Sequence, residues 1–169
     1  MQTKEYGVIL VGHGGIPKDY PSERVSKLKR LEAQRRAAGQ PMSQEEYELD
    51  TNIRTWPRTP ETDPYQAGLE ALAAQMKPML NGAQFSVAYN EFCGPTLSEA
   101  VENLIVQGAK HITVVSTMFT PGGSHSEYEI PEEMEELRAK HPDVKLRYAW
   151  PFNLNQVAQM LTDHINQFA

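Results

Sequence analysis

Two histidines and a glutamate lie in short motifs whose residue types could support metal chemistry. His13 lies in VGHGGIP, Glu91 in AYNEFCGPTL and His125 in TPGGSHSEYEIPE. Two neutral imidazoles and one carboxylate suit borderline divalent metals such as Co²⁺, Fe²⁺, Ni²⁺ and Zn²⁺. The same groups can accept protons near neutral pH, because a free histidine titrates at about 6.5. We therefore predict a site that binds a metal ion and takes up protons.

Metal insertion into a macrocycle needs both properties, because two pyrrole N–H protons must leave as the ion enters. We expect the glycines beside both histidines to leave room for a flat, bulky ligand close to the backbone. Glu129 follows His125 by four residues and could orient its ring as a second carboxylate, or could simply favour a helix N-terminus. The remaining histidines and the cysteine are expected to be structural: His111, His141, His164 and Cys93.

Four β-type stretches and four helical patterns alternate along the chain. The β-type stretches are 6–12, 84–92, 111–119 and 144–152, and the helical patterns cover 64–80, 97–105, 130–142 and 153–168. The first and third β-type stretches are almost unbroken in apolar character, as in parallel strands buried on both faces. This order predicts a three-layer α/β/α fold with a four-stranded parallel sheet. By analogy with flavodoxin-like sheets, we expect the strand order 2-1-3-4.

The predicted sheet explains how distant motifs could meet. Ligands of open parallel sheets bind beyond the carboxyl ends of the strands. His13 follows the first β-type stretch, Glu91 ends the second and His125 follows the third, while Trp150 and Phe152 end the fourth. We therefore expect two imidazoles, one carboxylate and an aromatic wall at the same edge of the sheet.

Residues 18–62 are far longer than an ordinary connection between a strand and a helix. They contain the basic helical stretch 22–38 and a second helix that Ser43 and Glu46 would open with a capping box. We expect residues 1–169 to form one α/β domain, with 18–62 as a helical insertion after the first strand. The insertion could be a lid or substrate clamp, a dimer contact or a surface decoration. Its basic side chains could meet the carboxylates of an acidic ligand or form a solvated face.

The composition and the absence of several known sequence motifs exclude some classes of function. A net charge of −6 over 169 residues argues against general affinity for nucleic acid. A single cysteine cannot form an internal disulfide and fits a reducing compartment. We expect no membrane association and a cytoplasmic location, because no apolar run is long enough for a signal peptide or a membrane span. GHGGIP lacks the third glycine of a dinucleotide fingerprint, and GGSHS does not match a nucleophile elbow.

Taken together, the motifs resemble those of the class II tetrapyrrole chelatases, the group of small sirohydrochlorin cobaltochelatases and ferrochelatases. The similarity lies in the strand ending in HG, in AYNEF-x-x-P-T-L and in F-x-x-GG-x-H-x-x-x-x-IPE, and it covers about 5–17 and 64–168. It implies that His13 and His125 are metal ligands and proton acceptors, with Glu91 in support. The sequence departs from the family in two places, where HGG replaces the usual HGS and where 18–62 is inserted.

The resemblance implies a chelatase that inserts Co²⁺ or Fe²⁺ into a tetrapyrrole such as sirohydrochlorin, as in cobalamin or sirohaem biosynthesis. The metal, which could also be Ni²⁺, is then a substrate, and no organic cofactor is expected. Larger members of this family contain two flavodoxin-like halves in one chain, so a chain with a single half implies a homodimer. Two alternatives stay open: a non-catalytic carrier of metal or metallated tetrapyrrole, and a metal-dependent hydrolase.

Overall fold

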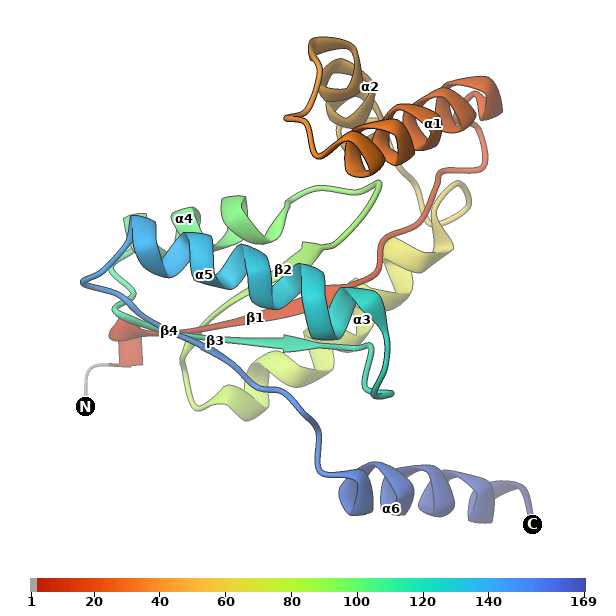
Figure 1. The fold of residues 1–169 in the computed structure, drawn as a ribbon. Helices are drawn as coiled ribbons and strands as arrows, with labels where there is room; N and C mark the ends of the chain where they lie inside the picture. The colour runs from red at the N-terminus through yellow and green to blue at the C-terminus, as the bar shows by residue number, and fades with distance from the viewer. Residues whose placement is uncertain (1–2) are drawn as a thin grey trace.

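A parallel sheet with helices on both faces forms the body of the protein (Figure 1). The computed structural model describes residues 3–169. The strands are β1 (Tyr6–Gly12), β2 (Gln84–Tyr89), β3 (His111–Ser116) and β4 (Lys145–Tyr148). They pair in parallel in the order β2-β1-β3-β4. The predicted flavodoxin-like α/β class and the 2-1-3-4 order are confirmed.

The connections decide which face each helix covers. The step from β1 to β2 crosses the sheet in one direction, and the steps from β2 to β3 and on to β4 run in the other. Right-handed crossovers therefore place α3 (Pro64–Met76) on one face and α4 (Leu97–Val106) with α5 (Ile130–Lys140) on the other. The larger core lies under α4 and α5 and includes Ile9, Val11, Val101, Leu104, Ile112, Val114, Ile130, Met134 and Leu146.

The strands end earlier than the sequence suggested, although the helices begin where capping residues predict. Asp63 caps α3 by accepting from the Gln66 backbone N–H at 3.0 Å. β2 ends at Tyr89 rather than near residue 92, because Cys93 N donates back to the Glu91 carbonyl at 2.7 Å and turns the chain. Glu91 consequently lies in a tight loop just beyond the strand.

The segment 18–62 forms two helices over the carboxyl ends of β1 and β2 (Figure 1). These are α1 (Ser22–Ala38) and α2 (Gln44–Arg54). Ser43 caps α2 by accepting from the Glu46 backbone N–H at 3.2 Å, as predicted. The predicted second hydrogen bond of the capping box, from the Ser43 backbone N–H to the Glu46 side chain, is wrong. The buried Glu46 carboxylate instead accepts from Arg35 Nε at 2.8 Å. A buried carboxylate needs a charged donor, and this pair joins α2 to α1.

A buried arginine fastens this insertion to the body. The Arg58 side chain is 4% exposed and forms an ion pair with the buried Asp63. It also donates to the backbone carbonyls of Gly15 at 3.0 Å and Ile53 at 2.9 Å, and to the carbonyl of Phe92. One guanidinium thus connects the loop after β1, the end of α2, the loop after β2 and the start of α3.

The C-terminal helix α6 (Leu154–Ile165) lies apart from the body, with no residue buried (Figure 1). Within residues 3–169, the helices are all too short or too polar to cross a membrane.

We predict that Arg58→Ala lowers the free energy of unfolding by about 3–5 kcal/mol, because it leaves the buried Asp63 carboxylate without its partner. Urea denaturation followed by circular dichroism measures the loss. Arg147→Ala, at an exposed position on β4, is the control and should change the value by less than about 0.5 kcal/mol. Equal losses for both variants would contradict the anchoring role.

Candidate metal site

His13 lies directly after β1, and its backbone and ring are both hydrogen-bonded. The His13 N–H donates to the Tyr65 hydroxyl at 2.7 Å, and the His13 carbonyl accepts from Glu91 N at 2.8 Å. The ring Nδ1 is 2.9 Å from the Gly14 carbonyl oxygen. Because a carbonyl oxygen can only accept, Nδ1 carries the proton and the lone pair lies on Nε2. His13 therefore presents one free ligand nitrogen.

His125 lies in a helical turn rather than in the loop that the sequence suggested. The residues His125–Glu129 form a wide π-type turn that leads directly into α5, and Ile130 N donates to the His125 carbonyl. The helical structure therefore begins at residue 125, five residues before the start at residue 130 that the sequence predicted. Wide turns of this kind are frequent at functional sites, because they redirect a side chain without breaking the helix.

Glu129 holds the His125 ring. Glu129 Oε2 lies 2.9 Å from His125 Nδ1 and 3.1 Å from Asn90 Nδ2. Burial disfavours ionisation of Glu129, but the hydrogen bonds from His125 and Asn90 outweigh it and lower the pKa of the carboxyl below its usual range. The ionised carboxylate can only accept, so in its hydrogen bond with His125 the ring proton is on Nδ1 and the lone pair is on Nε2. Asn90 Nδ2, which donates to Glu129, also lies 2.7 Å from Nδ1. Arg36 of the insertion contacts the other Glu129 oxygen at 3.4 Å.

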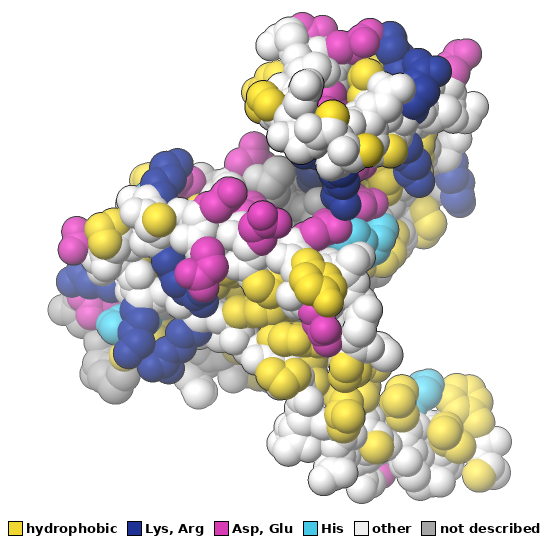
Figure 2. All heavy atoms as spheres, in the orientation of Figure 1, with side chains coloured by type: hydrophobic (Ala, Val, Ile, Leu, Met, Phe, Trp, Pro, Cys, Tyr) yellow, Lys and Arg dark blue, Asp and Glu magenta, His cyan; other side chains and the backbone are white. Residues whose placement is uncertain are grey.

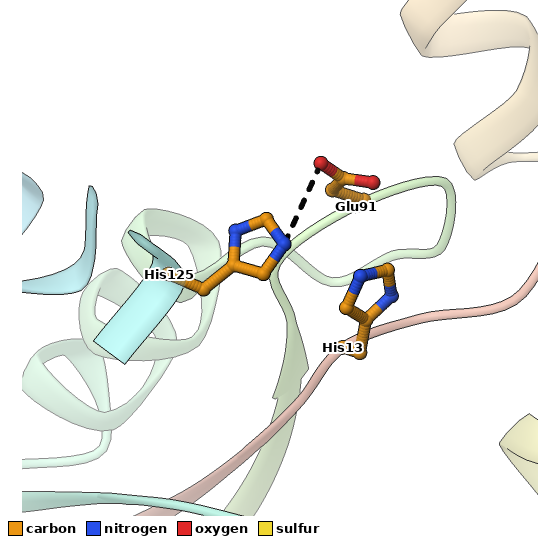
Figure 3. Close-up of side chains that lie close together, drawn as sticks. All are labelled: His13, Glu91 and His125. Carbon is orange, nitrogen blue, oxygen red and sulfur yellow. Dashed lines mark ion pairs between the residues drawn. The ribbon is translucent and has the colours of Figure 1, made fainter. Parts of the chain in front are cut away.

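The structure brings the three predicted ligands together (Figure 3). The His13 and His125 rings meet edge to face with centroids 4.8 Å apart, and His125 Nε2 lies 3.8 Å from Glu91 Oε1. One ligand atom from each residue lies within 4.8 Å of the other two, and all three side chains are half-buried. Ligands of one ion at bonds of about 2.1 Å lie roughly 3.5 Å apart, so small side-chain rotations would close the site.

Gly14 allows His13 and Glu91 to lie close together, but it does not leave room for a ligand as the sequence analysis predicted. Its φ of +99° is a left-handed conformation, and a Cβ at this position would overlap the Glu91 carbonyl oxygen. The space beside Gly14 is therefore filled by the loop after β2, not left open for a ligand. The glycines near His125 differ, since a Cβ on Gly122 would meet nothing within 4 Å.

Two adjoining hollows, of about 170 and 330 Å³, lie between the site and α1. Their shared walls come from Glu32 and Arg36 of α1 and from Glu91, Phe92 and Glu129 of the body, and His125 lines the larger hollow. Figure 2 shows histidine side chains at this recess beneath the α1–α2 lobe, with acidic and basic side chains around it. The insertion therefore forms one wall of the site.

The basic residues of α1 are less free than the sequence suggested. Arg36 contacts Glu32 at 2.6 Å as well as Glu129, and Arg35 pairs with the buried Glu46. Lys29 Nζ lies over the Phe92 ring, 5.3 Å from its centroid. The wall that α1 contributes to the site therefore contains positively and negatively charged side chains that lie close together.

Other expected site features lie elsewhere. Trp150 and Phe152 pack against each other and Phe152 packs against Phe119, so the predicted aromatic wall does not line either hollow in the described structure. Cys93 is buried in the core under α3. The remaining histidines have structural contacts: His111 stacks on Tyr6, His141 pairs with Glu102 and His164 packs on Phe168.

Sequence reasoning missed Asn90 and Tyr65, which hold the site. Asn90 could have been suspected from its place beside Glu91. Tyr65 carries no sequence signal, because its contact with His13 joins parts of the chain that only the fold brings together. Arg36 was among the basic residues expected to meet an acidic ligand or solvent, but its pairing with Glu129 was not predicted.

Comparisons with known proteins match the chain to one family. The CbiX family profile matches residues 61–167. A sirohydrochlorin ferrochelatase of Priestia megaterium is 29% identical over 82 residues, which cover 48% of this chain and 30% of that enzyme. A sirohydrochlorin cobaltochelatase of the same organism is 31% identical over 68 residues, covering 40% and 22%. The matched part of the chain thus spans less than a third of these relatives.

Among solved structures, a CbiX protein of Marinobacter aquaeolei VT8 shares the fold, with a TM-score of 0.54 and 18% identity over 96% of this chain and 95% of that one.

We predict that Gly14→Ala destabilises the protein by at least about 2 kcal/mol more than Gly122→Ala. Both substitutions place a side chain at positive φ, but only Gly14→Ala pushes against the Glu91 carbonyl. Chemical denaturation measures stability, and Co²⁺ titration followed by visible absorption measures metal binding, which only Gly14→Ala should weaken. Similar behaviour of the two variants would count against a close approach at Gly14.

Cys93 should be unreactive in the folded protein. Burial raises the pKa of its thiol to about 11, so its thiolate population at pH 7 is at least roughly 100-fold below that of a free cysteine. We expect maleimide labelling only after unfolding in guanidinium. A variant with Gln156→Cys, on an exposed face of α6, should label once in the native state. Rapid native labelling of the wild type would exclude a buried thiol.

Proposed function

The chain belongs to the CbiX family, and on this premise we propose that it inserts a divalent metal ion into a tetrapyrrole such as sirohydrochlorin. The observation that carries the proposal is the meeting of His13, Glu91 and His125 at the carboxyl edge of the sheet. This ligand set suits Co²⁺ and Fe²⁺, and the names of the two Priestia relatives fit the same metals. Ni²⁺ is a third candidate substrate. We expect no organic cofactor.

The metal ion would enter on the two histidine nitrogens that carry lone pairs. His13 and His125 each have Nδ1 occupied, by the Gly14 carbonyl and by Glu129 respectively, so both present Nε2. Glu91 Oε1 lies 3.8 Å from His125 Nε2 and can supply a carboxylate oxygen. Two neutral ligands and one anion bind a divalent ion without cancelling its charge, which favours release to a better chelator.

The same groups would then take up the protons. As the ion passes to the four macrocycle nitrogens, two pyrrole N–H protons must leave. The departing metal frees the lone pairs of His13 and His125, and each can accept one proton; Glu91 offers a further acceptor. Ligand exchange and proton transfer can therefore use the same three side chains.

The insertion would help to position the macrocycle. Lys29 lies in the wall of the larger hollow and can meet a peripheral carboxylate of an acidic substrate, whereas Arg36 in the same wall is paired with Glu32 and Glu129. The hollow of about 330 Å³ is at the low end for ligand pockets, so it would hold one part of the macrocycle while the rest extends outward. This corresponds to the clamp role among the alternatives for residues 18–62. We further propose that the protein acts as a homodimer in the cytoplasm.

We predict that His13→Ala and His125→Ala each slow metal insertion by at least about 100-fold, because each removes a metal ligand and a proton acceptor. Purified protein is mixed with sirohydrochlorin and Co²⁺ or Fe²⁺, and the change in tetrapyrrole absorption is followed. Glu91→Gln should slow the reaction by about 10-fold.

His111→Ala and His164→Ala are the matched controls, because these histidines contact only structural neighbours. Wild-type rates for both site variants would refute the mechanism. Tight binding of the tetrapyrrole with no conversion by the wild type would instead select the carrier alternative.

A further inference from the structure

The loop after β2, residues 90–93, carries the candidate metal ligand Glu91 and rises toward the insertion (Figure 1). Arg54, the last residue of α2, donates to this loop at two points. Its Nη1 lies 2.9 Å from the Cys93 carbonyl oxygen, and its Nη2 lies 3.2 Å from the Asn90 carbonyl oxygen. One side chain of the insertion therefore binds the loop backbone both before and after Glu91.

The side chain of Phe92 belongs to the hydrophobic core of the insertion. It is 8% exposed and packs in one cluster with Tyr20, Leu28 and Ile53. Phe92 has a φ of +57°, a left-handed conformation that residues with a side chain rarely adopt. Packing in this core and the hydrogen bond from Arg58 to the Phe92 carbonyl stabilise the conformation. The insertion therefore holds the residue that follows Glu91 by its side chain as well as by its backbone.

The opposite side of the loop is bound to the body of the protein. Glu91 N donates to the His13 carbonyl at 2.8 Å, and Asn90 N donates to the Gly12 carbonyl at 2.9 Å. Between these two sets of contacts, the Glu91 carboxylate lies 3.8 Å from His125 Nε2. The backbone that carries this carboxylate is thus fixed from both sides, by the end of β1 and by the insertion.

Arg54 is suited to hold the loop because each of its three side-chain nitrogens has a partner. Its Nε donates to Asp50 Oδ2 at 2.7 Å, one turn earlier on α2, and the side chain is only 18% exposed. A guanidinium is planar, so its two outer donors fix both the distance and the orientation of the groups that they bind. In the described structure its hydrogen bonds go to Asp50 and to backbone carbonyls, which leaves the Glu91 carboxylate available to a metal ion.

We propose that Arg54 is a positioning residue of the metal site, which fixes the loop 90–93 and thereby places the Glu91 carboxylate opposite His13 and His125. The insertion is then a structural part of the metal site as well as a wall of the recess beside it. This role rests on the proposed function, since it requires that Glu91 binds the metal ion.

The direction of the effect on metal binding separates positioning from charge. Arg54 lines the smaller hollow together with Glu91, so its positive charge disfavours a cation nearby. If charge alone mattered, a neutral replacement of Arg54 would strengthen the binding of a divalent cation. If Arg54 positions Glu91, the same replacement weakens binding, because the carboxylate is no longer held within reach of the ion.

Co²⁺ titration of the full chain, followed by visible absorption, tests this role. We expect Arg54→Gln to weaken Co²⁺ binding by about 10-fold, the low end for residues that support metal ligands. The spectrum of bound Co²⁺ should match that of Glu91→Gln, because in both variants the carboxylate no longer contacts the ion. In a Glu91→Gln background, Arg54→Gln should cause no further loss, because the side chain through which it acts is already absent.

Arg24→Gln is the matched control, and it should bind Co²⁺ as the wild type does. Arg24 lies in the same insertion and donates to Asn52 Oδ1 at 2.9 Å, a contact that joins α1 to α2 without reaching the loop. Arg54→Lys keeps the charge but loses the planar pair of donors, and it should weaken binding by about 3-fold. Circular dichroism verifies folding, and Arg54→Lys decides the matter if Arg54→Gln does not fold.

Co²⁺ binding as tight as that of the wild type in both Arg54 variants would overturn the positioning role and leave the metal site intact. Stronger binding by Arg54→Gln, or an equal further loss in the Glu91→Gln background, would also overturn it. A wild type that binds no Co²⁺ would refute the metal site and this role with it. A wild type that binds Co²⁺ but converts no sirohydrochlorin would refute only the proposed function.

Discussion

The candidate site depends on the hydrogen bond from Glu91 N to the His13 carbonyl, which continues the β1–β2 ladder beyond the strands. Asn90 N donates to the Gly12 carbonyl one step earlier, at 2.9 Å. The two loops can approach this closely only because Gly14 has no side chain. A backbone contact thus sets the spacing between an imidazole and a carboxylate, and the side chains adjust within it.

The position of His125 is fixed by a series of ion-pair and hydrogen-bond contacts between side chains. Arg36 on α1 contacts Glu129, Glu129 holds the ring of His125, and His125 faces Glu91. This series of contacts links the insertion to the candidate metal ligands without placing an insertion residue among them. Any movement of α1 relative to the sheet would change the support of Glu129. The buried Arg58 opposes such movement by joining the insertion to the loops after β1 and β2.

Helix α6 obeys a different constraint. The sheet has helices α4 and α5 on one face but only α3 on the other, and an α/β sheet is stable when both faces are covered. The aromatic contacts of Trp150 and Phe152 control where the last helix can go. The aromatic residues that the sequence predicted as a ligand wall instead pack together in the connection between the body and α6.

The sequence by itself determined which segments form strands and helices and which three residues meet at the site, whereas the strand order was expected by analogy with flavodoxin-like sheets. Hydrophobic period and capping residues are local properties, and the common carboxyl edge of a parallel sheet brings His13, Glu91 and His125 together once the order is known. Only the tertiary structure decided the rest: that Glu46 binds Arg35 rather than its own cap, that Gly14 accommodates Glu91 rather than a ligand, and that α6 leaves the body. Each of these depends on contacts between segments far apart in the chain, and such contacts leave no periodic signal in the sequence.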